Sequence, residues 1–183
     1  MTQVQTPPTT TSFADLLVGQ VAMEFHAHQQ YVALAVWFDA HDLQQLAKLF
    51  YAQALEERNH GMMMVQFQLD RDLPVTIPAT PAVRNDFTEV SELISLALQQ
   101  EKAVTTAIEG LMAAARRESD FMAEQFVLWF LKEQVEEVAS MSTLLTIVQR
   151  AGDDLFKVED WIAREHGPEG ADPTAPPVAG GAL

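Results

Sequence analysis

The chain has 183 residues, which is enough for one domain with a substantial core. It contains no cysteine, so disulfides, thiolate metal sites and thiol catalysis are excluded. Its formal net charge is −15 and its 11 basic residues are scattered, which argues against nucleic acid or an anionic membrane as a partner.

The N-terminal segment, residues 1–11, is rich in Thr, Pro and Gln, and we expect it to be flexible. It has neither a basic region nor an apolar stretch, so we expect no secretory signal and a cytoplasmic location. No uncharged apolar run of about 18 residues follows, so we predict no transmembrane helix.

The first predicted helix spans about residues 12–39, with Ser12 as its N-cap and Asp15 as the capping-box acid. A short turn at 39–42 leads to a second helix that is predicted to end near Arg71. Three prolines (Pro74, Pro78 and Pro81) then mark an extended connection of roughly 15 residues.

The third and fourth helices are predicted over about 88–117 and 119–150, with Gly152 as a C-cap, and a short fifth helix over about 153–165. We therefore predict an all-α fold, a four-helix bundle with one long crossover plus a short fifth helix, in a domain of residues 12–166. The Gly-, Pro- and Ala-rich tail, residues 167–183, is expected to be disordered, with docking into a larger protein shell as the alternative.

Each long helix carries one glutamate inside its apolar stripe, near the middle of the helix; these are Glu24, Glu57, Glu101 and Glu137. Antiparallel helices of similar length bring their midpoints to one level, so the four carboxylates are predicted to meet in the core. One such glutamate alone would usually mark a helix edge, but four at matching depth favour a common function.

Buried carboxylates without partners cost several kcal/mol each, and the basic residues of these helices lie off the apolar stripes. Two divalent metal ions would balance four carboxylates in formal charge. His60 follows Glu57 by three residues on the same face, and carboxylates with one imidazole suit iron or manganese, with zinc as a competitor.

Four motifs together resemble the non-haem bacterial ferritins, most closely the actinobacterial type: Glu24 with Tyr31, Glu56-Glu57-Arg58-Asn59-His60, Gln100-Glu101, and residues 129–137. The resemblance spans about residues 12–165. It implies an iron-storage subunit of a 24-subunit homo-oligomeric cage. It also implies a ferroxidase that oxidises Fe(II) with O2 or H2O2 at a buried di-iron centre and stores the product as a ferric mineral.

Residue by residue, the resemblance implies that Glu24, Glu57 and His60 bind a first iron. Glu57 would bridge to a second iron, which Glu101 contacts and which Gln134 and Glu137 approach. A third iron position is implied among acids on the second and fourth helices: Glu56, Glu133, Glu136 and Glu137. For Glu133 and Glu136, a solvated acidic strip is the alternative.

Two aromatic residues accompany these ligands in the resemblance. Tyr31 is expected to hydrogen-bond near the site, and Trp129 belongs to the fourth-helix motif; either could supply electrons during O2 reduction, and core packing is the alternative. His28 shares the stripe of Glu24 but is expected to be a hydrogen-bonded core histidine. Three other aromatic residues are candidates for outward contacts between subunits: Trp37, Phe50 and Phe156.

Two positions differ from the patterns of related di-iron proteins and indicate which subfamily the sequence resembles. The fourth helix has Gln134-x-x-Glu137 in place of a second Glu-x-x-His, which argues against bacterioferritin, rubrerythrin and ribonucleotide-reductase-like enzymes. Arg58 stands where bacterioferritins carry a haem-binding methionine, so no haem is expected. A neutral Gln134 is expected to leave the second iron loosely held, as suits a site from which the product must leave.

Three other functions fit the sequence less well. A DNA-protecting shell of the Dps type would need a basic tail, which neither terminus has. A free-standing di-iron oxidase acting on an organic substrate would be a monomer or dimer. A metal-free structural subunit would be expected to lose the ligands that are kept here.

Overall fold

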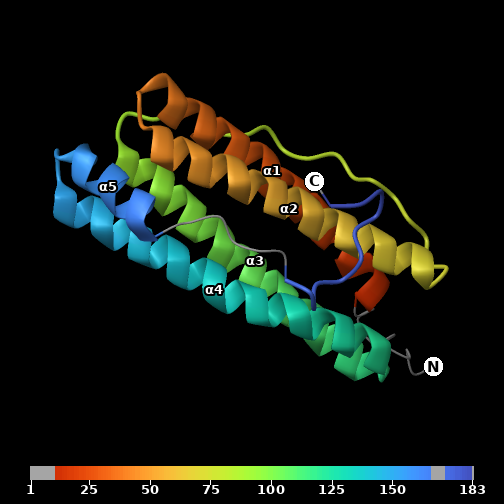
Figure 1. The fold of residues 1–183 in the computed structure, drawn as a ribbon. Helices are drawn as coiled ribbons and strands as arrows, with labels where there is room; N and C mark the ends of the chain where they lie inside the picture. Colours follow the sequence, from red (N-terminus) through yellow and green to blue (C-terminus); the bar gives the residue numbers. More distant parts are fainter. Residues whose placement is uncertain (1–10, 166–171, 183) are drawn as a thin grey trace, which may run out of the picture.

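A computed structural model gives the fold of residues 11–165 and 172–182. This part of the chain forms five helices and no strand: α1 (Phe13–Ala40), α2 (Gln44–Asp70), α3 (Val90–Glu118), α4 (Phe121–Ala151) and α5 (Leu155–Glu165). Figure 1 shows four long helices lying side by side, with α5 packed at one end. The predicted all-α bundle with a short fifth helix is confirmed. The predicted flexible segment, residues 1–11, lies outside the described residues except for Thr11.

The helix ends are set by local hydrogen bonds. The Asp15 N–H donates to Ser12 Oγ at 3.1 Å, and the Ser12 hydroxyl donates to the Asp15 carboxylate at 2.6 Å, as the predicted cap of α1 requires. Ser119 has a left-handed backbone (φ 57°) that ends α3, and the Asp120 side chain then caps α4 through the Ala123 N–H at 3.0 Å. The tight α3–α4 turn thus makes these helices antiparallel neighbours.

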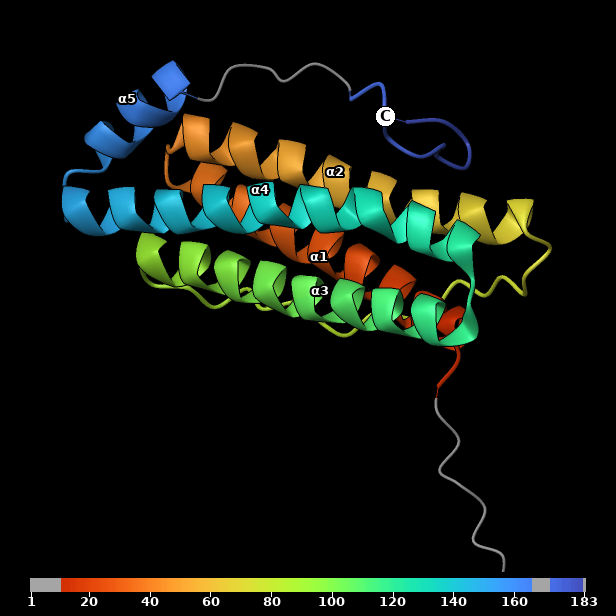
Figure 2. The same cartoon turned by 90° about the horizontal axis from the view of Figure 1, so that it is seen from below.

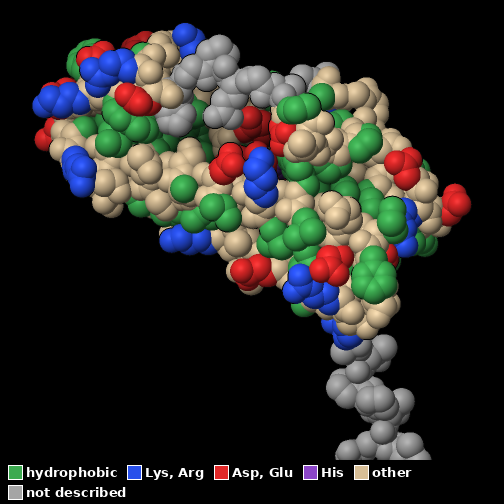
Figure 3. All heavy atoms as spheres, turned by 60° about the horizontal axis from the view of Figure 1, so that its bottom comes forward, with side chains coloured by type: hydrophobic (Ala, Val, Ile, Leu, Met, Phe, Trp, Pro, Cys, Tyr) green, Lys and Arg blue, Asp and Glu red, His purple; other side chains and the backbone are tan. Residues whose placement is uncertain are grey.

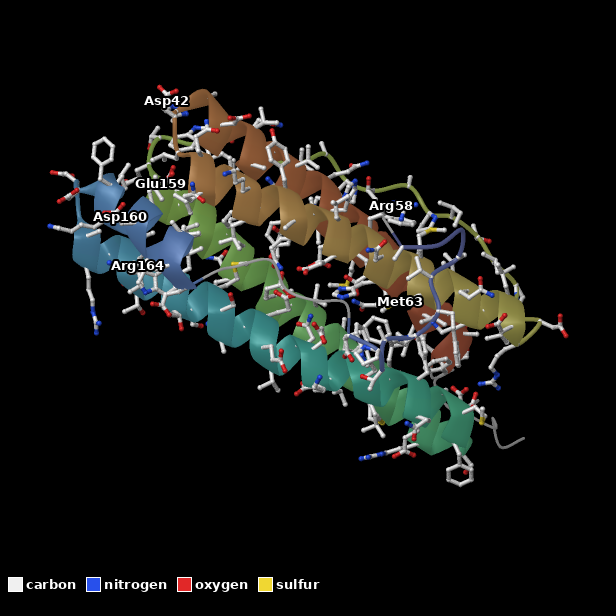
Figure 4. The ribbon with its side chains drawn as sticks, viewed as in Figure 1. Asp42, Arg58, Met63, Glu159, Asp160 and Arg164 are labelled. Carbon is white, nitrogen blue, oxygen red and sulfur yellow. The ribbon has the colours of Figure 1, made fainter. Side chains whose placement is uncertain are left out.

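The start of α2 is capped by α5 rather than by its own N-cap residue. Leu43 offers no side-chain cap, and the Glu159 carboxylate instead accepts the backbone N–H groups of Gln45 (2.8 Å) and Leu46 (2.9 Å). Figure 4 labels Glu159 on α5 beside the start of α2. Because an anion at a helix N-terminus satisfies free N–H groups, this contact fixes α5 on the bundle.

The long crossover between α2 and α3 runs along α1, as Figure 1 shows. The buried Gln30 side chain binds it at two points. Its amide nitrogen donates to the Arg84 carbonyl, and its amide oxygen accepts the Arg84 N–H, both at 2.8 Å. Thr80 adds a hydrogen bond to Gln29 at 3.0 Å. The extended segment that the prolines predict is therefore held against the bundle by hydrogen bonds, mainly between the Gln30 side chain and the Arg84 backbone.

The apolar core is divided into two clusters. One cluster includes Leu34, Phe38 and Phe50 and extends to α5, and the other includes Leu17, Met64 and Phe130 at the opposite end of the bundle. The glutamate-bearing segments of all four long helices lie between them. The expectation that Phe50 faces outward is wrong, because its side chain is fully buried and packs on Tyr31 and Phe38.

The C-terminal tail, which is expected to be disordered, is described by the structure over residues 172–182. Figures 1 and 2 both show this segment beside α2 and α4. The Trp129 indole N–H donates to the Asp172 carboxylate at 3.1 Å, Lys132 pairs with Asp172 at 3.7 Å, and the Ala179 N–H donates to the Met62 carbonyl at 3.2 Å. Tail composition could not predict these contacts, because their partners lie on other helices.

The surface agrees with the dispersed charge of the sequence. On the face in Figure 3, Lys and Arg side chains are interspersed with Asp and Glu. None of the helices in the described part of the chain is long and apolar enough to span a membrane.

Candidate metal centre

A layer of polar side chains lies between the two apolar clusters. Its members come from all four long helices, and each is no more than 7% exposed: Glu24, Glu57, His60, Glu101, Gln134 and Glu137. The stripes traced in the sequence therefore do turn these side chains inward. The two sides of this layer differ in their hydrogen bonding.

The first side consists of Glu24, Glu57 and His60. One ligand atom from each of these residues lies within 4.8 Å of the others, and no other group within the described residues meets this criterion. Both Glu57 oxygens and Glu24 Oε2 are buried and accept no hydrogen bond, and His60 Nδ1 lies 3.6 Å from Glu57 Oε2. Buried acceptors without donors, next to an imidazole, fit a hard or borderline divalent cation.

The second side contains Glu101, and its polar atoms are already partnered. The Tyr31 hydroxyl donates to Glu101 Oε1, and Gln134 Nε2 lies 3.5 Å from Glu101 Oε2. Thr105 Oγ1 lies 2.8 Å from Gln134 Oε1 and also 2.8 Å from the Glu101 backbone oxygen. A cation on this side would replace or rearrange hydrogen bonds that already exist.

Burial raises the pKa of the carboxylates in this layer. Burial raises the pKa of Glu24 and of Glu57 well above the ordinary value, and the neighbouring charges of Glu57 and Glu101 add to this. Burial also raises the pKa of Glu137 and, less strongly, that of Glu101, whose bond from Tyr31 acts in the opposite direction. Without a cation, a proton held by Glu24 or Glu57 forms a hydrogen bond between the two carboxyl groups. A divalent cation bound among these carboxylates would stabilise their charged forms and so oppose the shifts.

The structure adds supporting residues that the sequence analysis missed. Gln20 is 2% exposed and donates to Glu24 Oε1 at 2.8 Å. Gly61 follows His60 where α1 and α2 approach closely, since a Cβ there would lie 2.9 Å from Phe25 Cε1. Gln20 precedes Glu24 by one helical turn on a buried face, so a glutamine at that spacing was an available signal.

Aromatic rings and one histidine surround the first side. Trp129 and Phe130 pack edge-on against the His60 ring, with centroid separations of 5.6 and 5.8 Å. The predicted core role of His28 agrees with its contact, since its Nδ1 lies 2.6 Å from the Ala54 carbonyl oxygen. These contacts hold the His60 ring and leave His28 engaged by the backbone of α2.

The acids of the predicted third iron position are more exposed than Glu24, Glu57 and His60. Glu56 is partly buried and accepts a hydrogen bond from Gln53, Glu133 is partly buried, and Glu136 is exposed. Glu56 and Glu133 lie near enough to Glu137 to raise its pKa, after burial and Glu101. Glu56 and Glu133 therefore border the polar layer, whereas Glu136 lies on the exposed surface of α4.

The sequence of this chain matches those of known proteins. Residues 14–151 match the sequence profile of a family described as a ferritin-like domain. Ferritin BfrB of Mycolicibacterium smegmatis is 58% identical over 173 residues, covering 94% of this chain and 96% of that protein. Ferritin BfrB of Mycobacterium tuberculosis is 52% identical over 183 residues, the full length of both proteins.

More distant proteins also match this chain in sequence or in fold. A bacterial non-heme ferritin of Staphylococcus aureus is 34% identical over 140 residues, which are 76% of this chain and 84% of that protein. In fold, an open-pore ferritin from the archaeon Archaeoglobus fulgidus has a TM-score of 0.80 over 86% of this chain and 99% of its own, at 24% identity.

Proposed function

The chain belongs to the ferritin family, which confirms the resemblance, and on this premise we propose that it is a non-haem ferritin subunit that oxidises and stores iron. Fe(II) is the substrate, and it is oxidised to Fe(III) at the buried polar layer. The observation that carries this proposal is the set of three buried carboxylate oxygens, on Glu24 and Glu57, that accept no hydrogen bond beside His60.

Two Fe(II) ions bind to two overlapping sets of residues in the polar layer. Glu24, Glu57 and His60 hold the first ion, and Glu57, with two free oxygens, bridges to the second. Glu101 and Glu137 bind the second ion, with Gln134 beside it. Four carboxylates neutralise two divalent ions, so binding releases the protons that the raised pKa values of these groups retain.

The oxidation itself needs an electron acceptor from solution. Two Fe(II) ions release two electrons, which with two protons reduce O2 to H2O2, or H2O2 to two waters. Tyr31 contacts Glu101 and Trp129 contacts His60, so both aromatic residues lie one contact from the ligands. We assign Tyr31 the role of orienting Glu101 and of a candidate electron donor.

A third Fe(II) position is part of the proposal. Glu56, Glu133 and Glu136 would form it together with Glu137, which lies i+4 from Glu133 and i+3 from Gln134 and so borders both positions. The partial burial of Glu133, which raises its pKa, favours a cation there over a fully solvated acidic strip.

The assembly is proposed to be a cytoplasmic 24-subunit cage without haem. Arg58 occupies the position after the bridging glutamate, and its charged guanidinium cannot replace a methionine as a haem ligand. No nucleic acid or membrane partner is proposed. Docking of the C-terminal tail into a larger protein shell is not pursued, because residues 172–182 contact the chain's own bundle. Size-exclusion chromatography separates this cage from the alternative, a monomeric or dimeric di-iron oxidase.

The decisive experiment adds Fe(II) in air to purified protein and follows the absorbance of ferric species. The wild type is compared with Glu57→Ala, His60→Ala and a surface control, Glu109→Ala on the exposed side of α3. We expect oxidation to slow strongly in the first two variants and to be unchanged in the control. Equal rates in all four proteins would remove the ferroxidase assignment.

A further inference from the structure

The hydroxyl of Thr105 makes contacts that its single proton cannot satisfy together. Thr105 Oγ1 lies 2.8 Å from the Glu101 backbone oxygen, one helical turn earlier, and 2.8 Å from Gln134 Oε1 on α4. A hydroxyl has one O–H donor and two acceptor lone pairs. Both neighbours are acceptors, so only one of these contacts is a full hydrogen bond at any time.

Rotating the Gln134 amide by half a turn removes this conflict. Its nitrogen would then donate to Thr105 Oγ1, and the hydroxyl proton would go to the Glu101 carbonyl, so that both contacts become good hydrogen bonds. Gln134 is 3% exposed, so water does not easily provide these partners instead. The rotation, however, turns Gln134 Oε1 toward Glu101 Oε2, in the place of the amide nitrogen now 3.5 Å away.

Two acceptor oxygens facing each other repel unless a proton or a cation lies between them. Two oxygens that bind one divalent cation at about 2.1 Å each are separated by roughly 3 to 3.4 Å, close to the spacing found here. The amide orientation that suits Thr105 best is therefore the orientation that a cation on the Glu101 side stabilises.

We propose that Thr105 is a positioning residue that lets Gln134 turn its amide oxygen to the second Fe(II) when the ion binds, and its amide nitrogen to Glu101 when the ion leaves. This inference rests on the proposed function. The hydroxyl serves both orientations, as an acceptor in the first and as a donor in the second. A bound ion can shift the amide because it interacts differently with its two ends.

The test measures anaerobic Fe(II) binding to the metal-free, assembled protein by isothermal titration calorimetry. Thr105→Val keeps the shape of the side chain and removes the hydroxyl, and we expect binding at the second position to weaken about 10-fold, with the first unchanged. Thr105→Ser keeps the hydroxyl and is expected to restore the affinity. The matched control is Thr106→Val, since the Thr106 hydroxyl makes the same one-turn contact, to Lys102 at 3.0 Å, but is exposed.

A double-mutant comparison shows whether Thr105 acts through Gln134. In a Gln134→Leu background, Thr105→Val should have no further effect on Fe(II) affinity. A full additional loss in that background, no loss in Thr105→Val alone, or no rescue by serine would each overturn the inference. Thr105→Ala replaces Thr105→Val if the valine variant fails to assemble. A wild type that binds no Fe(II) would instead overturn the proposed function, whatever Thr105 does.

Discussion

On the Glu57 side of the centre, three carboxylate oxygens accept no hydrogen bond. On the Glu101 side, Tyr31 and Gln134 contact the two carboxylate oxygens of Glu101, and Thr105 contacts Gln134. An ion that binds beside Glu57 has only the shared proton of Glu24 and Glu57 to displace. An ion that binds beside Glu101 must compete with hydrogen bonds that the protein already makes. The difference indicates one tight and one weaker position within a single polar layer.

This asymmetry has a functional reading within the proposed ferroxidase. A tightly held first ion fixes the bridging Glu57, and a weakly held second ion can leave after oxidation. The supporting groups follow the same division, because Gln20 orients Glu24 with one hydrogen bond while the Glu101 side has a connected network. Substitutions on the two sides should therefore affect Fe(II) binding and stability differently.

The largest expected effect comes from Glu57→Gln, because Glu57 serves both positions. We expect anaerobic Fe(II) affinity to fall at both by at least about 100-fold, the upper end of what loss of an outer-shell partner costs. Calorimetric titration measures this, with Glu109→Gln as the charge-matched surface control. If only one position weakens, Glu57 does not bridge, and the two sides are independent sites.

The next prediction concerns the stability of the metal-free protein as a function of pH. Burial raises the folded-state pKa of Glu24, Glu57 and Glu137 above the ordinary 4.5, so their stabilising contribution is complete below that value and is lost as pH rises through the folded-state pKa. Each unit of elevation is worth about 1.4 kcal/mol. We expect thermal unfolding of chelator-treated protein at a lower temperature near pH 8 than near pH 5.5.

Two comparisons make the pH prediction specific to the polar layer. Glu57→Gln should reduce the dependence of unfolding temperature on pH, because one of the titrating groups is gone. Added Fe(II), under anaerobic conditions, should reverse it, since the ligands bind the ion in their deprotonated form. A dependence that is the same in Glu57→Gln as in the wild type would place its origin elsewhere in the acidic chain.

The inward position of the acids was predictable from the sequence on both sides of the centre, but the Thr105 contact on the Glu101 side was not. Helical spacing turns Glu24, Glu57 and His60 inward, and their burial follows from that spacing alone. The Thr105 contact with Gln134 depends on the axial register of α3 against α4, which no local pattern specifies. Spacing identifies which residues face the core, and packing decides which of their atoms meet.

Packing between distant parts of the chain also explains two other differences between the predicted and the observed structure. Phe50 lies beside residues of the predicted stripe of α2, but the arrival of Tyr31 and Phe38 from α1 buries it. Hydrogen bonds from the nearby Thr174 are the main reason that the pKa of Asp172 is lowered to about 2. Asp172 lies in a Pro- and Gly-rich segment, yet its contacts with Trp129 and Lys132 tie this segment to α4. Both depend on partners far away in the sequence.

A smaller effect is expected from Tyr31→Phe, which removes the hydrogen bond to Glu101 without changing the packed ring. A buried acceptor that loses its donor costs about 1–3 kcal/mol, so we expect the metal-free protein to lose about this much stability by denaturant unfolding. Fe(II) affinity at the second position should fall while the first stays unchanged. A loss at the first position would show that Tyr31 supports the layer as a whole.

The smallest expected effect tests how the first side is built. Gly61→Ala places a methyl group 2.9 Å from Phe25 Cε1 beside His60, whereas Gly110→Ala, on α3, meets nothing within 4 Å. Both gain about 1 kcal/mol of helix propensity, but only Gly61→Ala must move a neighbouring ring, at a cost of about 1–3 kcal/mol. We therefore expect Gly61→Ala to be less stable than Gly110→Ala by that cost, and to weaken only the first Fe(II) position. Equal stability of the two variants would mean that Phe25 yields freely, and that close approach of α1 and α2 is not what holds Glu24 against Glu57.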